Sequence, residues 1–125
     1  MKFDFESDVA LFLQVAQQLE TDIFHKVYLA GEQVPSTTEI SMAYQINPAT
    51  VLKGMNILVQ AGVLEKRRGM GTFVTEQAWE ILREKKYRLF SQQQLQNFIE
   101  TAKALGISKS DLLILIEGGY DELKR

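Results

Sequence analysis

The chain of 125 residues contains no cysteine and only one histidine, one tryptophan and two prolines. Without cysteine it can form neither a disulfide framework nor a thiolate zinc site, and it has no cysteine nucleophile. A multi-histidine metal site or a histidine-paired nucleophile would need a second chain, because His25 is alone. These absences exclude the commonest metal and nucleophile chemistries, and they are typical of a reducing compartment.

Long apolar runs are missing as well. The longest is Leu112–Ile116, too short to cross a bilayer, and the acidic start MKFDFESD lacks the apolar core of a signal peptide. Apolar residues make up 46% of the chain and charged residues 24%, close to globular averages, and the length is that of about one domain. We therefore expect a small cytoplasmic protein without membrane association.

Positive charge is scarce, since 14 basic residues face 16 acidic ones and the pI is near 5.4. Such an average argues against nucleic-acid binding. The distribution is uneven, however: residues 1–35 hold two lysines and six acidic residues, residues 36–74 four basic and two acidic, and residues 75–125 eight of each. Because salt screens charges beyond about 10 Å, the local excess in residues 36–74 matters more than the sum. This segment is the candidate site for an anionic partner.

Apolar residues at steps of three and four predict three helices before residue 63. The first covers about residues 9–29, with Val27 on its inward face, and ends before Gly31. The second begins with the capping box Ser36–Glu39 and buries Ile40 and Ala43. The third opens on the N-cap and N1 pair Asn47–Pro48 and stops at Gly62.

A hairpin follows, with strands at residues 63–66 and 72–74 around a glycine-containing turn. The helical period returns from about Glu76 to Gly106, with a kink expected near Ser91, and a last helix starts near Ser108. The fold class is therefore mainly α with a small β-hairpin: a winged helix-turn-helix over residues 1–75 and a two-helix dimerisation tail over residues 76–125.

The third helix and the hairpin carry the side chains that suit DNA. Ala49, Thr50 and Lys53 would reach base edges or phosphates from a helix in the major groove, and the helix starts at Ser36 and Asn47 could hold phosphates. At the turn, Gly69 and Gly71 allow positive φ around Met70, while Arg67 and Arg68 could clamp phosphates or enter a minor groove. The plain alternatives are ordinary exposed helix residues and a hairpin whose arginines serve solubility.

Three stretches resemble the GntR family of bacterial transcription regulators: Val34–Ser41, Ile46–Val51 and Ala61–Val74. The segment Phe12–Leu19 is similar to that family's first helix, so the resemblance covers roughly residues 10–75, and the Gly-x-Gly-Thr-Phe-Val hairpin is its most specific part. The Asn-Pro-x-Thr-Val opening and the short tail look like the YtrA-type branch, which couples a DNA-binding domain to a helical dimerisation hairpin.

The resemblance implies a homodimeric repressor on a double-stranded, inverted-repeat operator, with no cofactor. The family commonly has arginine where Thr38 stands, and many members have it at Pro48, so few cationic contacts and weak binding per subunit are expected. The positions implied to contact DNA are Ser36, Thr37, Thr38, Asn47, Ala49, Thr50, Lys53, Arg67, Arg68, Gly69, Met70, Gly71 and Thr72.

The tail carries more apolar positions than two lone helices can hide. Pairing with a second copy would bury them and set two DNA-reading helices about 34 Å apart, whereas the alternative is a tail that folds back on its own winged domain. Trp79 is expected to pack in the core near the hinge. The expected interface residues are Leu82, Phe90, Leu95, Phe98, Ile99, Leu112, Leu115 and Ile116.

The sequence argues against some alternatives to DNA binding and leaves others open. An enzyme is not expected, because no nucleophile–base arrangement is visible and the turn Gly69–Gly71 precedes a strand rather than the helix of a phosphate-binding loop. We expect no metal site. A winged-helix module that binds proteins instead of DNA remains the rival, and a small-molecule effector is left open.

Overall fold

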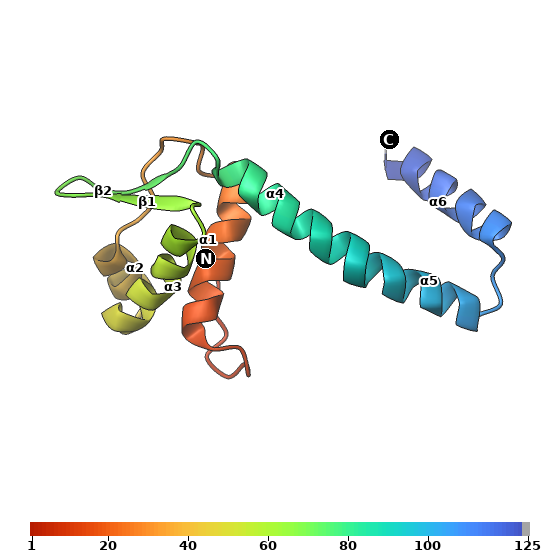
Figure 1. The fold of residues 1–125 in the computed structure, drawn as a ribbon. Helices are drawn as coiled ribbons and strands as arrows, with labels where there is room; N and C mark the ends of the chain where they lie inside the picture. The colour runs from red at the N-terminus through yellow and green to blue at the C-terminus, as the bar shows by residue number, and fades with distance from the viewer. Residues whose placement is uncertain (124–125) are drawn as a thin grey trace. The chain divides into compact units, whose positions relative to one another are not determined.

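In a computed structural model, residues 1–123 are described, and they divide into two compact units: Met1–Lys85 (unit 1) and the described residues from Lys86 on (unit 2). The structure is mostly helical with one two-stranded antiparallel sheet, which confirms the predicted fold class (Figure 1). The elements are α1 (Leu11–Phe24), α2 (Thr37–Tyr44), α3 (Pro48–Gln60), β1 (Leu64–Arg67), β2 (Gly71–Val74), α4 (Ala78–Leu89), the π-helical segment η1 (Phe90–Gln94), α5 (Leu95–Ala104) and α6 (Lys109–Leu123).

The core of unit 1 forms where α1 packs against α3. Gly54 of α3 lies so close to α1 that a Cβ there would stand 2.5 Å from the Phe12 carbonyl oxygen and 2.8 Å from the Val15 Cβ. The close approach is therefore possible only without a side chain at this position. The large side chains that this packing buries are Val15, Leu19, Ile23, Ile40, Val51, Met55 and Leu58.

The helix starts follow the sequence prediction. The Ser36 Oγ accepts a hydrogen bond from the Glu39 backbone N–H at 3.0 Å, and the Glu39 carboxylate accepts one from the Ser36 N–H at 3.2 Å. The Asn47 Oδ1 accepts from the Ala49 N–H at 2.8 Å, with Pro48 in the first turn. Both predicted caps are confirmed, but Ala43 is exposed, because Ile40 is the residue that α2 turns into the core.

Helix α1 ends at Phe24, five residues short of the predicted end at residue 29. Lys26 adopts the left-handed conformation with φ 62°, and the N–H groups of Lys26 and Val27 bond back to the carbonyls of Ile23 and Asp22 at 3.0 and 2.8 Å. This is a Schellman end, in which the left-handed residue is usually glycine. Val27 consequently points outward and is 61% exposed, which corrects its predicted inward position.

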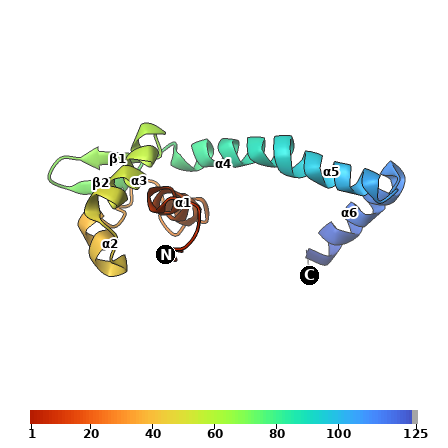
Figure 2. The same cartoon turned by 90° about the horizontal axis from the view of Figure 1, so that it is seen from below.

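The hairpin pairs β1 with β2 antiparallel, with Leu64 opposite Val74 and Arg67 opposite Gly71. The chain before α2 runs along the other edge of β2, where the Val34 N–H donates to the Thr72 carbonyl and the Val74 N–H to the Glu32 carbonyl, both at 2.9 Å. The hairpin therefore has backbone support from residues 31–34. Its turn projects from the three helices of unit 1 in both views (Figures 1 and 2).

The first two turns of α4 belong to unit 1, since Ala78 and Leu82 are each 1% exposed in its core. The Lys85 ammonium bonds the buried Glu20 carboxylate at 3.0 Å, and the Trp79 indole N–H donates to the Phe24 carbonyl at 3.0 Å. Trp79 thus packs as predicted, but Leu82 has no surface left for a partner chain. The prediction of Leu82 as an interface residue is therefore wrong. These contacts also place the end of unit 1 later than the predicted residue 75.

Unit 2 consists of the rest of the helical tail, in which α6 turns back along α5 (Figure 1). The irregularity expected near Ser91 is the π-helical segment η1 rather than a proline- or glycine-type kink. Over residues 86–122, Ala102 is the only buried apolar side chain. None of the helices described has both the length and the apolar composition that a membrane crossing requires.

Candidate nucleic-acid interface

The two helices before the hairpin are joined by a tight turn at Gln45 and Ile46. Gln45 takes the left-handed conformation that ends α2, and the Ser41 hydroxyl donates to the Ile46 carbonyl at 2.6 Å. The buried Ile46 side chain anchors the turn in the core of unit 1. A short helix, a three-residue turn and a capped second helix make the helix-turn-helix that the sequence predicted.

The start of α2 has free donors, although not on Ser36. The capping box uses the Ser36 hydroxyl and the Glu39 N–H, whereas the N–H groups of Thr37 and Thr38 have no hydrogen-bond partner within residues 1–123. Thr38 is exposed, and Ser36 and Thr37 are half-buried. A phosphate at this end would therefore meet the backbone of Thr37 and Thr38, next to the helix dipole.

The sequence predicted that the start of α3 could hold a phosphate, but the backbone N–H groups there are already hydrogen-bonded. Asn47 accepts the N–H groups of Ala49, Thr50 and Val51 through its side-chain and backbone oxygens, at 2.8, 3.0 and 3.1 Å, and Pro48 has no N–H. This first turn has no donor left for an anion. What α3 presents instead are side chains: exposed Asn47 and Ala49, and half-buried Thr50.

Loss of this cap has a predictable cost. In the variant Asn47→Ala, the Ala49 N–H in the first turn of α3 would lose its side-chain acceptor, so unit 1 should be destabilised by about 1 kcal/mol. Urea unfolding followed by circular dichroism would measure the change, with Asn47→Asp as the control that keeps a capping oxygen. An unchanged midpoint in Asn47→Ala would show that water replaces the cap without cost.

Lys53 is exposed, and its Nζ lies 4.0 Å from the centre of the Phe12 ring of α1. Such a cation–π contact at the surface is worth about 0.5–1 kcal/mol, so it holds the ammonium only weakly. A phosphate could therefore draw Lys53 away from the ring.

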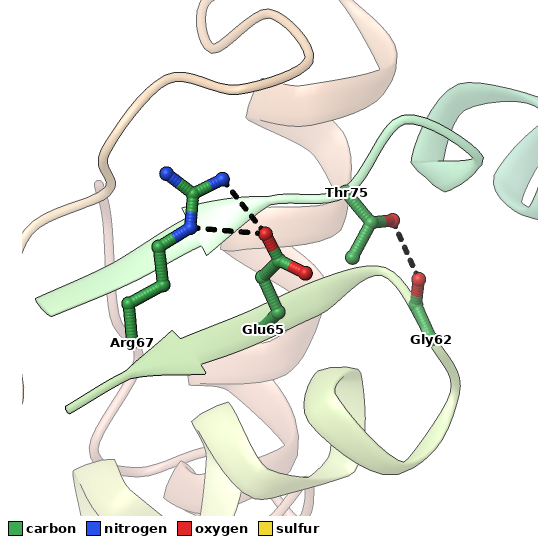
Figure 3. Close-up of polar contacts among 4 residues, drawn as sticks. All are labelled: Gly62, Glu65, Arg67 and Thr75. Carbon is green, nitrogen blue, oxygen red and sulfur yellow. Dashed lines mark hydrogen bonds and ion pairs between the residues drawn. The ribbon is translucent and has the colours of Figure 1, made fainter.

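The two arginines of the wing, residues 64–74, are not equivalent. The Nη2 of Arg67 lies 2.8 Å from the Glu65 carboxylate (Figure 3). The Cζ of Arg67 lies 4.2 Å from the centre of the Phe73 ring. Both ion-pair side chains are more than 40% exposed, so the pair contributes well under 1 kcal/mol to stability. Its effect on a ligand is larger, because Glu65 offsets the charge that Arg67 would bring to DNA.

Arg68 at the tip has no side-chain partner within the described residues and is exposed. Next to it, Gly69 has φ 74° with open space around it, and Met70 is 62% exposed. Arg68 is therefore the wing cation that is available to an anion without breaking an existing contact.

The sequence did not indicate the roles of two residues, Lys66 in the wing and Gln33 outside it. Lys66 shares the face of β1 that Leu64 turns to the core, and its Nζ bonds the Asn56 Oδ1 of α3 at 2.7 Å. The period of two along the strand could have placed Lys66 on the α3 side, opposite Thr72. Gln33 donates to the Met70 carbonyl at 3.1 Å, and no pattern in the sequence indicates this long-range support.

Glycine at position 71 is favoured by its backbone conformation. Its φ is 117°, and a Cβ there would collide with the Gln33 side-chain amide. At the base of the hairpin, the Thr75 hydroxyl donates to the Gly62 carbonyl at 2.6 Å (Figure 3). The wing is thus fixed at both ends, and its tip is open. All of the predicted DNA-contacting positions lie in unit 1, and each is exposed or half-buried.

Comparison with known proteins relates this arrangement to transcription regulators. The family model described as "Bacterial regulatory proteins, gntR family" matches residues 11–74. The uncharacterised HTH-type transcriptional regulator YhcF of Bacillus subtilis (strain 168) is 34% identical over 113 residues, which cover 90% of this chain and 92% of YhcF. The HTH-type transcriptional repressor YtrA of the same organism is 29% identical over 100 residues, covering 80% of this chain and 77% of YtrA.

One of the similar solved structures contains a bound partner. The N-terminal domain of AraR, determined in complex with a mutant of ORR3, matches 56% of this chain and all of that domain, with 26% identity and a TM-score of 0.53. ORR3 is the operator held by the AraR DNA-binding domain in a second structure.

Proposed function

The chain belongs to the gntR family of bacterial regulatory proteins, and from this premise we propose that it is a homodimeric repressor that binds an inverted-repeat operator in double-stranded DNA. As a member of that family it is a transcriptional regulator with a DNA-binding domain and not an enzyme. The resemblance to the YtrA-type branch is confirmed by the similarity to YtrA along most of both chains. Repression is proposed because YtrA is a repressor.

The observation that carries the DNA proposal is the open wing tip beside the helix-turn-helix. Among residues 1–123, Arg68 has no side-chain partner and Lys53 has only a ring contact, while Lys66 reaches toward α3. These three cations per protomer are the candidates for phosphate contacts, while Ala49 and Thr50 of α3 are the candidates for base contacts in the major groove. The AraR complex with ORR3 supports the same use of the fold here.

Dimerisation is proposed from the apolar surface of unit 2. Phe90 is 52% exposed, Phe98 47% and Leu115 61%, and Leu113 and Ile114 are also at least half exposed. Exposed apolar surface on this scale marks an interaction site in a soluble protein. A second copy that offers the same face would cover it with closed symmetry. The proposed interface residues are Phe90, Leu95, Phe98, Ile99, Leu112, Leu115 and Ile116.

Charge placed on this face should separate the subunits. In Phe98→Glu, an apolar ring worth about 1.5–3 kcal/mol of burial is replaced by a carboxylate that must stay hydrated, so the dimer should weaken at least tenfold. Sedimentation equilibrium would measure the change, with Asn97→Glu as the control that adds the same charge to the neighbouring exposed position. A wild-type chain that stays monomeric at all concentrations would contradict the dimer.

The rival function is a winged-helix module that binds a protein. One observation favours it, since Glu65 offsets Arg67 and Glu39 caps α2 where a phosphate would approach. Electrophoretic mobility shifts with DNA from the chain's own promoter region decide between the two. A mobility shift of the DNA that weakens steeply with salt supports the DNA-binding repressor. Absence of a shift at low salt supports the protein-binding module.

A further inference from the structure

A small pocket lies within unit 1, between the end of α1, the segment that follows it, the end of β2 and the start of α4. Its volume is about 210 Å³, below the roughly 300–1,000 Å³ of pockets that hold drug-sized ligands. A pocket of this volume has room for a small metabolite but not for a nucleotide. The apolar wall includes Ile23, Val74 and Trp79, and the polar groups include Lys26, Tyr28 and Glu76.

Lys26 occupies a position where its backbone is strained. A left-handed conformation costs a residue with a side chain about 1–2 kcal/mol, and the Schellman end of α1 would form more easily with glycine. The strained backbone places the Lys26 ammonium 5.5 Å from the centre of the Trp79 ring, at the pocket wall. Strain of this kind is informative when it holds a functional group in place.

Opposite charges line the pocket without neutralising each other. Within the described residues, neither Lys26 nor Glu76 makes an ion pair, although both border the same 210 Å³ volume. Burial and the nearby Asp22 carboxylate raise the pKa of Tyr28 above its ordinary value, and Tyr28 also lines a second hollow that Asp22, Glu39 and Tyr44 border. The pocket thus offers a cation and an anion beside an apolar wall.

We propose that this pocket binds a small zwitterion, an α-amino acid with an apolar side chain. The ligand carboxylate pairs with the Lys26 ammonium, the ligand ammonium pairs with the Glu76 carboxylate, and the ligand side chain packs on Trp79 and Val74. A ligand with both charges satisfies both partners at once, whereas an amine or a carboxylate alone would leave one of them unpaired.

The pocket is connected to the wing by hydrogen bonds. The chain leaves the pocket wall at Leu29 and Ala30 and runs directly into residues 31–34, where the Gly31 N–H donates to the Val74 carbonyl at 2.8 Å. Two residues further, the Gln33 amide supports the wing tip through the Met70 carbonyl. A bound ligand therefore biases the position of the wing and with it the affinity for DNA. This regulatory consequence rests on the proposed function, but binding of the ligand does not.

Trp79 lines this pocket and is the only tryptophan in the chain, so tryptophan fluorescence reports on its surroundings. The chain is titrated with L-valine, L-leucine, L-methionine and L-phenylalanine, and with isobutylamine and isovalerate as probes that each lack one charge of the zwitterion. At least one amino acid should give a saturable emission change, with binding at least tenfold tighter than for the single-charge probes. Absence of a saturable change with all four amino acids would overturn the proposal.

Lys26→Gly is the decisive variant, because it keeps the left-handed backbone at lower cost and removes only the ammonium. Its stability should be equal to or above that of the wild type by thermal unfolding, while its ligand affinity falls about tenfold or more; Glu76→Gln should show the same loss. If Lys26 serves only to end α1, Lys26→Gly will bind as the wild type does, and the proposal fails. The titrations need no DNA, so a chain that binds the amino acid but no operator refutes the proposed function and not the pocket.

Discussion

Arg68→Ala should weaken operator binding at least about a hundredfold for a dimer, whereas Arg67→Ala should have a much smaller effect. The Arg68 side chain has no partner in the part of the chain that the structure describes, and a charged hydrogen bond to phosphate in each of two wings is worth about 1.5–3 kcal/mol. Arg67 already pairs with Glu65 and packs on Phe73. Removal of Arg68 should also reduce the slope of log K against log salt by about 2, since each lost phosphate contact accounts for about 0.9. Fluorescence anisotropy with a labelled duplex at several salt concentrations measures both quantities.

The matched variant for this prediction is Glu65→Gln. It keeps the shape of the side chain but releases Arg67 from a carboxylate, so DNA affinity should rise and its salt dependence should steepen. Equal losses for Arg67→Ala and Arg68→Ala, with no gain for Glu65→Gln, would mean that the wing meets DNA in another conformation.

Gly54→Ala should destabilise unit 1 by about 1–3 kcal/mol, although alanine normally favours a helix over glycine by about 1 kcal/mol. The added Cβ would stand 2.5 Å from the Phe12 carbonyl oxygen, and this backbone atom cannot move without shifting α1. α3 would have to move away from α1, so affinity for DNA should fall together with stability. Urea unfolding followed by circular dichroism gives the free energy of unfolding.

Gly119→Ala in α6 is the control, because nothing lies within 4 Å of a Cβ at that position. There the helix propensity of alanine should act alone, and the variant should be as stable as the wild type or more so. If Gly54→Ala behaves in the same way as Gly119→Ala, the close approach of α1 and α3 is relaxed in solution and the explanation of Gly54 is wrong.

Short sequence patterns predicted the helices and the hairpin that position the candidate nucleic-acid interface. The Ser36–Glu39 capping box and the Asn47–Pro48 pair determine where α2 and α3 begin, because each side chain satisfies donors only a few residues away. The hairpin was also predicted, since its turn needs glycine at Gly69 and Gly71, both of which have positive φ. In these cases the stabilising contacts are close in sequence as well as in space.

The errors concern contacts between distant segments. Leu82 has the spacing of an interface residue, but the core of unit 1 buries it, and the Gln33 contact with the wing spans 37 residues. The early end of α1 depends on a left-handed Lys26, a conformation that lysine rarely takes, so no helix-stop signal precedes Gly31. The sequence analysis did not predict the Glu65–Arg67 ion pair, although the period of two along the strand places both residues on one face.

The most direct test of the proposed function is the equilibrium binding of the wild-type chain to its own promoter DNA as a function of salt, with stoichiometry measured in parallel. Three candidate cations per protomer, Lys53, Lys66 and Arg68, give six in a dimer, so log K should fall linearly with log salt with a slope of about −5, at two protomers per duplex. Binding that does not change with salt, or a single protomer that binds as tightly as two, would contradict a dimeric repressor that holds DNA through its wings.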